Sequence, residues 1–218
     1  MGYIRMKNTG NKIRVGKIVA AGSNYLDHTK EMGSPRPEAP VLFLKPSTSI
    51  VHEGEPIVFP RVGKVLHHEV ELGLVIGSEC RDVPAERVSE HVVGYLLALD
   101  LTLRDLQSDA KKLGLPWSTA KGFDCACPVS EALPIEQLTD LRALDLGLDV
   151  NGEKRQRGNT RDMLWGPEEL VALASRFFTL ERGDVILTGT PAGVGPLERC
   201  DSVEAWLGNL LSVSFDVV

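Results

Sequence analysis

Three acidic residues are the first side chains in this chain whose types and spacing indicate chemistry. Glu69 and Glu71 are two residues apart in a segment that alternates apolar and polar side chains, as a strand does. They therefore leave the same face, with Cα atoms roughly 6.6 Å apart. Asp100 ends an apolar strand-like run, where a charge without a partner is costly. Three carboxylates that share a hard cation, Mg²⁺ or Mn²⁺ before Ca²⁺, would explain them, and the alternative for the glutamates is a solvent-exposed face.

A histidine and a glutamate form a second candidate pair. His28 and Glu31 are three residues apart on a short predicted helix, so their side chains can face each other. A carboxylate that orients and charges an imidazole makes it a better general base. The alternative is an ordinary pair on the surface of a helix.

Cationic and amide donors follow Asp100. Arg104, Gln107 and Lys111 share one face of the helix predicted there, and Lys121 stands immediately before a glycine. Next to a metal ion, such donors would stabilise a substrate carboxylate or a developing enolate. The alternative is that these charges are merely solvated.

Other motifs exclude several classes of site. The glycine-rich loop Thr188–Gly195 has neither the ending of a P-loop nor the G-x-G-x-x-G spacing of a dinucleotide site, so we expect a tight loop whose backbone approaches a ligand. No G-x-S-x-G elbow is present. The four cysteines lack the spacing of a zinc ribbon and are too sparse for a disulfide scaffold, which favours reduced thiols: Cys80, Cys125, Cys127 and Cys200.

The pattern of apolar residues predicts a fold rich in strands. We expect strands at 17–21, 41–44, 65–76, 92–101, 144–150, 184–187 and 210–218, and helices at 25–32, 84–91, 102–113 and 166–178. Asn151-Gly152 indicates a hairpin turn, and Gly114 ends a helix. Strands and helices do not alternate regularly, so the prediction is one mainly β domain with short helices (α+β). We expect residues 1–16 to be a short N-terminal segment, either a flexible leader or a first hairpin, with a transit peptide as a further alternative.

The composition argues against several kinds of partner. The chain has 218 residues with 24 Lys and Arg against 30 Asp and Glu, a net charge of −6, which disfavours nucleic acid and anionic membranes. No apolar run approaches the roughly 20 residues of a membrane span. Because no signal-peptide pattern is visible either, we expect a cytoplasmic protein that acts on a small molecule.

Several ordered motifs resemble one known family. They are Gly22-Ser-Asn-Tyr-Leu-Asp-His28, Val41-Leu-Phe-Leu-Lys-Pro-Ser47, His67-His-Glu-Val-Glu-Leu-Gly73, Leu99-Asp-Leu-Thr-Leu-Arg-Asp-Leu-Gln107, Gly114-Leu-Pro-Trp-Ser-Thr-Ala-Lys-Gly122, Gln156-Arg-Gly-Asn-Thr160 and Ile186-Leu-Thr-Gly-Thr-Pro-Ala-Gly-Val-Gly195. From about Lys17 to the C-terminus the chain resembles the fumarylacetoacetate hydrolase family, and within it the small acylpyruvase branch. The resemblance implies a single catalytic domain at 17–218, a mixed β-sandwich roll, a homodimer and one divalent cation per subunit.

The resemblance also implies roles for individual residues. The metal ligands would be Glu69, Glu71 and Asp100, the water-activating dyad His28 and Glu31, the assisting oxyanion donor or proton source Lys121, and the substrate contacts Tyr25, Lys45, Arg104, Gln107 and Thr190. The long fumarylacetoacetate-cleaving branch adds a fourth carboxylate ligand upstream of the histidine, whereas 17–25 contains no acid here. This difference favours the small-enzyme branch.

The expected activity follows from this branch. A Mg²⁺-dependent hydrolase would cleave the C–C bond of a 2,4-diketo acid, such as acetylpyruvate or fumarylpyruvate, to pyruvate and a carboxylic acid. The alternatives are decarboxylation of oxaloacetate, or isomerisation or decarboxylation of an unsaturated 2-oxo dicarboxylate in aromatic catabolism, as by a 2-hydroxyhepta-2,4-diene-1,7-dioate isomerase. A binding protein that has kept the fold without chemistry is a further alternative.

Overall fold

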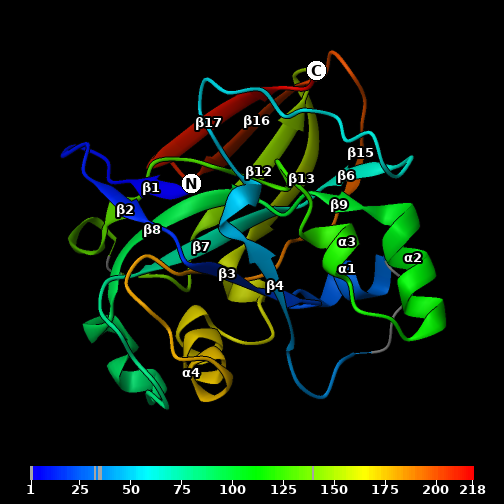
Figure 1. Cartoon of the computed structure of the whole chain (residues 1–218). Coiled ribbons are helices and arrows are strands. Elements are labelled where there is room, and N and C mark those ends of the chain that lie inside the picture. The colour runs from blue at the N-terminus through cyan, green and yellow to red at the C-terminus, as the bar shows by residue number, and fades with distance from the viewer. Residues whose placement is uncertain (1, 32, 34–35, 139) are drawn as a thin grey trace.

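The computed structural model describes residues 2–31, 33, 36–138 and 140–218. As predicted, the fold is mainly β with short helices (Figure 1). A large, curled mixed sheet packs against a smaller antiparallel sheet, and a three-stranded sheet and an N-terminal hairpin complete the body. No helix in the described part of the chain is long and apolar enough to cross a membrane.

The large sheet has the strand order β4-β3-β14-β7-β8-β10-β5, with β11 added to β8. Two neighbouring pairs, β3 with β14 and β5 with β10, are parallel, and the other pairs are antiparallel. The strands are β3 (Lys17–Gly22), β4 (Val41–Pro46), β5 (Ile50–His52), β7 (Val70–Ile76), β8 (Val92–Leu99), β10 (Cys127–Val129), β11 (Leu133–Pro134) and β14 (Val185–Leu187).

The second sheet is antiparallel throughout, in the order β13-β12-β16-β17. Its strands are β12 (Asp145–Val150), β13 (Glu153–Asn159), β16 (Ser202–Leu207) and β17 (Leu211–Asp216). The predicted Asn151-Gly152 turn is confirmed, since both residues have positive φ, as a tight hairpin between right-twisted strands requires. Apolar residues of both sheets, such as Leu72 and Leu148, share one core cluster, so the sheets form a sandwich.

The remaining strands flank this sandwich. The three-stranded sheet has the order β15 (Gly195–Leu197), β6 (Leu66–His68), β9 (Thr102–Leu103). β1 (Tyr3–Arg5) and β2 (Lys12–Arg14) form a hairpin whose Ile4 and Ile13 are buried in a second apolar cluster with Val75 and Leu96. Among the expectations for the N-terminal segment, the hairpin is confirmed.

Of the four α-helices in the described part of the chain, three lie together at one side of the molecule (Figure 1). They are α1 (Leu26–Glu31), α2 (Arg104–Leu113) and α3 (Ser118–Lys121), whereas α4 (Pro167–Phe177) lies apart from them. Gly114 ends α2 in the left-handed conformation, as predicted. The predicted end of the first helix, Met32, lies outside the described residues. The 3-10 helices are η1 (Ser47–Ser49), η2 (Ala85–Glu90), η3 (Ile135–Gln137) and η4 (Thr160–Asp162).

Three predicted elements differ from the structure. The prediction of a single strand at 65–76 is wrong, because the segment is interrupted at Glu69 and forms two strands, β6 and β7. The helix expected at 102–113 begins at Arg104, since residues 102–103 pair with β6 as β9. The segment 84–91 forms a 3-10 helix instead of an α-helix. In each case tertiary pairing or a local turn overrides the sequence pattern.

Candidate active site

The three acidic residues converge. Glu69 stands between β6 and β7, Glu71 lies in β7, and Asp100 follows β8. Because Val70 pairs with Leu99 and the Asp100 amide donates to the Glu69 carbonyl, the ends of these antiparallel strands bring the side chains together. One oxygen from each carboxylate lies within 4.8 Å of the others, and all three residues are buried. The solvent-exposed alternative for the glutamates is therefore wrong.

Cationic side chains hold two of the acids. Lys121 Nζ donates to Glu69 Oε2 at 2.8 Å and to Asp100 Oδ2 at 2.5 Å, and Arg104 donates to Glu69 Oε1. Burial favours the neutral form of Glu69, but the ion pairs with Lys121 and Arg104 prevail and hold the pKa of Glu69 far below its usual range. Likewise, burial lowers the pKa of Lys121, but Asp100 and Glu69 outweigh burial and raise it.

Glu71 has the opposite environment. Burial and the neighbouring Asp100 carboxylate raise the pKa of Glu71 well above its usual value. Its Oε2 accepts a hydrogen bond from the Gly189 amide, and the Lys45 ammonium group lies 2.7 Å from Asp100 Oδ1. Carboxylates as crowded as these repel one another, and a bound cation relieves that repulsion. An all-oxygen set of donors fits a hard divalent ion, so these residues fit the expected metal.

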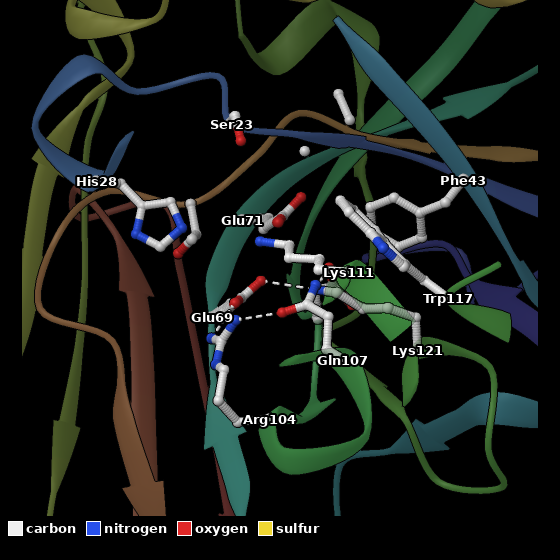
Figure 2. Close-up of a pocket in the computed structure, with 14 residues that line it drawn as sticks. Ser23, His28, Phe43, Glu69, Glu71, Arg104, Gln107, Lys111, Trp117 and Lys121 are labelled. Carbon is white, nitrogen blue, oxygen red and sulfur yellow. Dashed lines mark hydrogen bonds and ion pairs between the residues drawn. The ribbon is translucent and has the colours of Figure 1, made fainter. Parts of the chain in front are cut away.

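His28 and Glu31 form the expected pair. His28 Nδ1 lies 3.2 Å from Glu31 Oε2, and the Gly193 amide donates to the same carboxylate at 3.1 and 3.2 Å. Glu31 thus fastens α1 to the glycine-rich loop, which the sequence predicted to approach a ligand. His28 is nearly buried and lines the cavity above the acids (Figure 2). With Nδ1 engaged, Nε2 is the nitrogen left to contact a ligand.

One face of α2 forms the opposite wall of the cavity. Arg104, Gln107 and Lys111 line it together, as their spacing predicted (Figure 2). Arg104 is fixed by donating to Gln107 Oε1 at 2.7 Å and to His67 Nδ1 at 3.3 Å. Lys111 Nζ lies 5.2 Å from the centre of the Trp117 ring, within the range of a cation–π contact.

The other predicted substrate contacts separate into two groups. Thr190 lines the cavity, but Tyr25 is buried outside its lining. Burial and Glu71 raise the pKa of Tyr25 far above its usual value, and its hydroxyl has no hydrogen-bond partner in the described part of the chain. The expectation that Lys45 contacts substrate does not hold, because Lys45 is fully buried and donates to the carbonyls of Leu101, Lys121 and Ala126.

Sequence reasoning missed several residues of the site. Ser23, Phe43 and Trp117 also line the cavity, and Gln156 forms hydrogen bonds to Val70 and Thr190, which belong to two of its walls. All four missed residues lie inside the motifs that carry the family resemblance, so position within a motif was the available signal. Nothing in the local pattern around Gln156 marks it as buried, because its neighbours are polar.

A comparison with known protein families decides the assignment. The model of the fumarylacetoacetate (FAA) hydrolase C-terminal family matches residues 17–218. The chain belongs to this family. Human oxaloacetate tautomerase FAHD1, mitochondrial, is 49% identical over 200 residues, which cover 92% of this chain and 90% of the human protein. Oxaloacetate tautomerase YcgM of Escherichia coli is 48% identical over 203 residues, 93% and 89% of the two chains.

Solved structures agree with the family assignment. The crystal structure of fumarylpyruvate hydrolase from Pseudomonas aeruginosa in complex with Mn²⁺ and pyruvate has a TM-score of 0.94 and 35% identity, covering 99% of this chain and 95% of that one. The similarity confirms the predicted fold. Together with the acidic cluster, a relative that holds Mn²⁺ supports a divalent-metal site in this member of the fumarylacetoacetate hydrolase family.

Proposed function

We propose that this chain is a divalent-metal-dependent enzyme that interconverts the keto and enol forms of oxaloacetate. The observation that carries the proposal is the convergence of Glu69, Glu71 and Asp100 beneath a wall of cationic side chains. It occurs in a chain 48–49% identical to oxaloacetate tautomerases from a mammal and a bacterium. The sequence analysis offered decarboxylation of oxaloacetate as an alternative but not its tautomerisation, and the names of these relatives support tautomerisation over hydrolysis.

The metal site follows from the donor set. Glu69, Glu71 and Asp100 would hold Mg²⁺, or Mn²⁺ in its place, because hard cations prefer carboxylate oxygens. Such an ion, when bound, supplies Lewis acidity that polarises a carbonyl and acidifies the adjacent C–H bonds.

The charges of the cavity favour a substrate with two carboxylates. The lining has three acidic residues, and Arg104, Lys111 and Lys121 contribute three positive charges, so the formal charges cancel. A divalent cation would leave an excess of two positive charges in a partly enclosed space, where electrostatic interactions are stronger than in water. Oxaloacetate carries two negative charges and matches this excess.

Two side chains are placed to move the proton. In the keto form a C3–H bond breaks and an O–H bond forms at the 2-oxygen, so one group must accept a proton and another must supply one. His28, oriented by Glu31, would accept the proton from C3 through Nε2. Lys121 would donate to the developing charge on the oxygen, since its ammonium group already faces the carboxylates.

The test follows the enol absorbance of oxaloacetate in the ultraviolet. We expect added Mg²⁺ or Mn²⁺ to accelerate the approach to keto–enol equilibrium and EDTA to abolish the acceleration. Parent protein that leaves the rate at its buffer value with either ion would overturn the proposal.

Hydrolysis of 2,4-diketo acids is the second candidate. The His28–Glu31 pair that would move a proton in oxaloacetate can also activate water, and a structural neighbour is a fumarylpyruvate hydrolase with bound pyruvate. A panel of acetylpyruvate, fumarylpyruvate and oxaloacetate separates the reactions. Hydrolysis yields pyruvate and a second carboxylic acid, whereas decarboxylation of oxaloacetate yields pyruvate and CO₂.

The setting of the enzyme is also a proposal. We retain the expectation of a cytoplasmic homodimer that binds neither nucleic acid nor membranes. Light scattering coupled to gel filtration tests the dimer, because a monomer has a mass of 23.8 kDa.

A further inference from the structure

Gln156 of β13 is a polar side chain with no exposed surface. Its Oε1 accepts hydrogen bonds from the Val70 amide at 3.0 Å and from His68 Nδ1 at 2.9 Å. Its Nε2 donates to Thr190 Oγ1 at 2.7 Å and to the Pro191 carbonyl at 2.9 Å. A backbone amide only donates and a carbonyl only accepts, so these two partners fix which end of the carboxamide is oxygen.

This amide connects the two walls that carry the candidate site. Val70 lies between Glu69 and Glu71, where the chain leaves β6 and enters β7, and Thr190 lies in the glycine-rich loop at the edge of the cavity. All the hydrogen-bonding capacity of the Gln156 carboxamide is used. A fully satisfied buried polar group fixes the geometry of its neighbours, whereas a partly satisfied one destabilises the fold.

The hydrogen bond from Gln156 determines whether the Thr190 hydroxyl donates or accepts toward a ligand. A hydroxyl has one proton to donate and two lone pairs to accept with. Because the Gln156 N–H group donates to Thr190 Oγ1, the hydroxyl keeps its own proton for another acceptor. Within the described residues, Thr190 Oγ1 donates to no protein atom, and its side chain lines the cavity.

We propose that Gln156 is a positioning residue that makes the Thr190 hydroxyl a hydrogen-bond donor toward a carboxylate oxygen of the bound 2-oxo acid. The inference rests on the proposed function only in that the ligand is a 2-oxo acid. It does not depend on whether that acid is tautomerised, hydrolysed or decarboxylated.

The test replaces the donor and keeps the shape. In Gln156→Glu, one oxygen can still accept from Val70 and His68, but the N–H donor becomes an acceptor, so the Thr190 hydroxyl turns toward it and away from the ligand. Thr190→Val removes the hydroxyl. The probe is pyruvate, titrated by calorimetry into Mn²⁺-loaded protein. Each variant should raise the Kd of pyruvate about tenfold or more, the loss expected for one hydrogen bond to a charged group.

A double variant separates positioning from a general structural effect. If Gln156 acts through Thr190, the Gln156→Glu/Thr190→Val protein should bind pyruvate about as weakly as either single variant. Thr190→Ser, which keeps the hydroxyl, should bind pyruvate nearly as the parent does. The affinity for Mn²⁺ without pyruvate should stay within about twofold of the parent in the position-190 variants.

Several results would overturn the inference. One is an unchanged Kd of pyruvate in folded Gln156→Glu. Another is a double variant in which the increase in the Kd of pyruvate equals the product of the increases in the two single variants. The third is a parent protein that does not bind pyruvate. If Gln156→Glu does not fold, Gln156→Met replaces it: it is similar in size and removes the N–H that orients the Thr190 hydroxyl without adding an acceptor, so the Kd of pyruvate should still rise, but by less. If the parent protein binds pyruvate but does not tautomerise oxaloacetate, only the proposed function is overturned, because pyruvate binding requires no turnover.

Discussion

Lys45 Nζ lies 2.7 Å from Asp100 Oδ1, and neither side chain is appreciably exposed to solvent. The same ammonium group donates to three backbone carbonyls, which belong to Leu101, Lys121 and Ala126. One lysine thus connects the segment after β8, the end of α3 and the residue before β10. It supports a candidate metal ligand and the backbone of a candidate catalytic residue from outside the cavity lining.

Removing this cation should destabilise the protein. Lys45→Met leaves three buried carbonyls without their donor and the Asp100 carboxylate without its ion pair. Breaking a buried charge pair from one side costs about 3–5 kcal/mol of unfolding free energy. Urea denaturation measures the change, and Lys112→Met, at an exposed position in the last turn of α2, is the control expected within about 0.5 kcal/mol of the parent. A Lys45→Met protein as stable as the control contradicts this role.

Glu71 is the acid whose environment most needs a cation. Glu71→Gln keeps the size and an acceptor for the Gly189 amide but removes the charge. We expect the affinity for Mn²⁺ to fall more than tenfold and enol-oxaloacetate turnover to fall with it, both measured on the purified protein. Glu79→Gln, at an exposed position, should leave both unchanged. Equal Mn²⁺ titrations for the two variants would remove Glu71 from the ligand set.

His28 should be separable from metal binding. His28→Asn removes the general base that Glu31 orients, and help of this kind is worth roughly 10²–10⁴-fold in rate. The Mn²⁺ affinity should remain, because none of the three acids donates to or accepts from His28. Steady-state rates and a Mn²⁺ titration provide the two measurements. The control is His91→Asn, since His91 does not line the cavity. Parental turnover in His28→Asn would show that another group moves the proton.

The convergence of the three acidic residues was predicted from the sequence more accurately than the bounds of the strand at 65–76. Alternation placed Glu69 and Glu71 on one face, and the apolar run before Asp100 indicated a buried charge. The break at Glu69 was not predictable, because the Val70 amide bonds to a glutamine 86 residues away instead of to a neighbouring strand. The periodicity of a sequence reflects local conformational preference and cannot predict a hydrogen bond between residues that are distant in the sequence.

The burial of Lys45 illustrates the same limit. A lysine in an apolar strand next to a proline was compatible with a pocket position, and the family resemblance placed it near the substrate. Its true partners are carbonyls at positions 101, 121 and 126, which come together only when the sheet and α3 have packed. The type of residue was informative, but its contacts depended on the tertiary structure.

Lys111 should select substrates with a second carboxylate. Its side chain lines the cavity, and its ammonium group lies 5.2 Å from the centre of the Trp117 ring, where it can face a second carboxylate of a bound substrate. Lys111→Met should therefore raise the KM for oxaloacetate severalfold while changing the Kd of pyruvate, which has one carboxylate, by less than twofold. Lys112→Met, at the neighbouring exposed position, is the matched control. Equal effects of Lys111→Met on both ligands would contradict a role in selectivity.

The cysteines should differ sharply in reactivity toward alkylating agents. Burial raises the pKa of the Cys127 thiol to about 12, so at pH 8 only about one molecule in 10⁴ carries the reactive thiolate there. Cys200 is exposed. Iodoacetamide at pH 8, followed by peptide mass spectrometry, should label Cys200 within minutes and leave Cys127 unmodified until urea unfolds the chain. Raising the pH toward 10 increases the thiolate fraction of Cys127, but burial still excludes the reagent. Labelling of Cys127 at the rate of Cys200 in the folded protein would mean that the core around β10 opens readily.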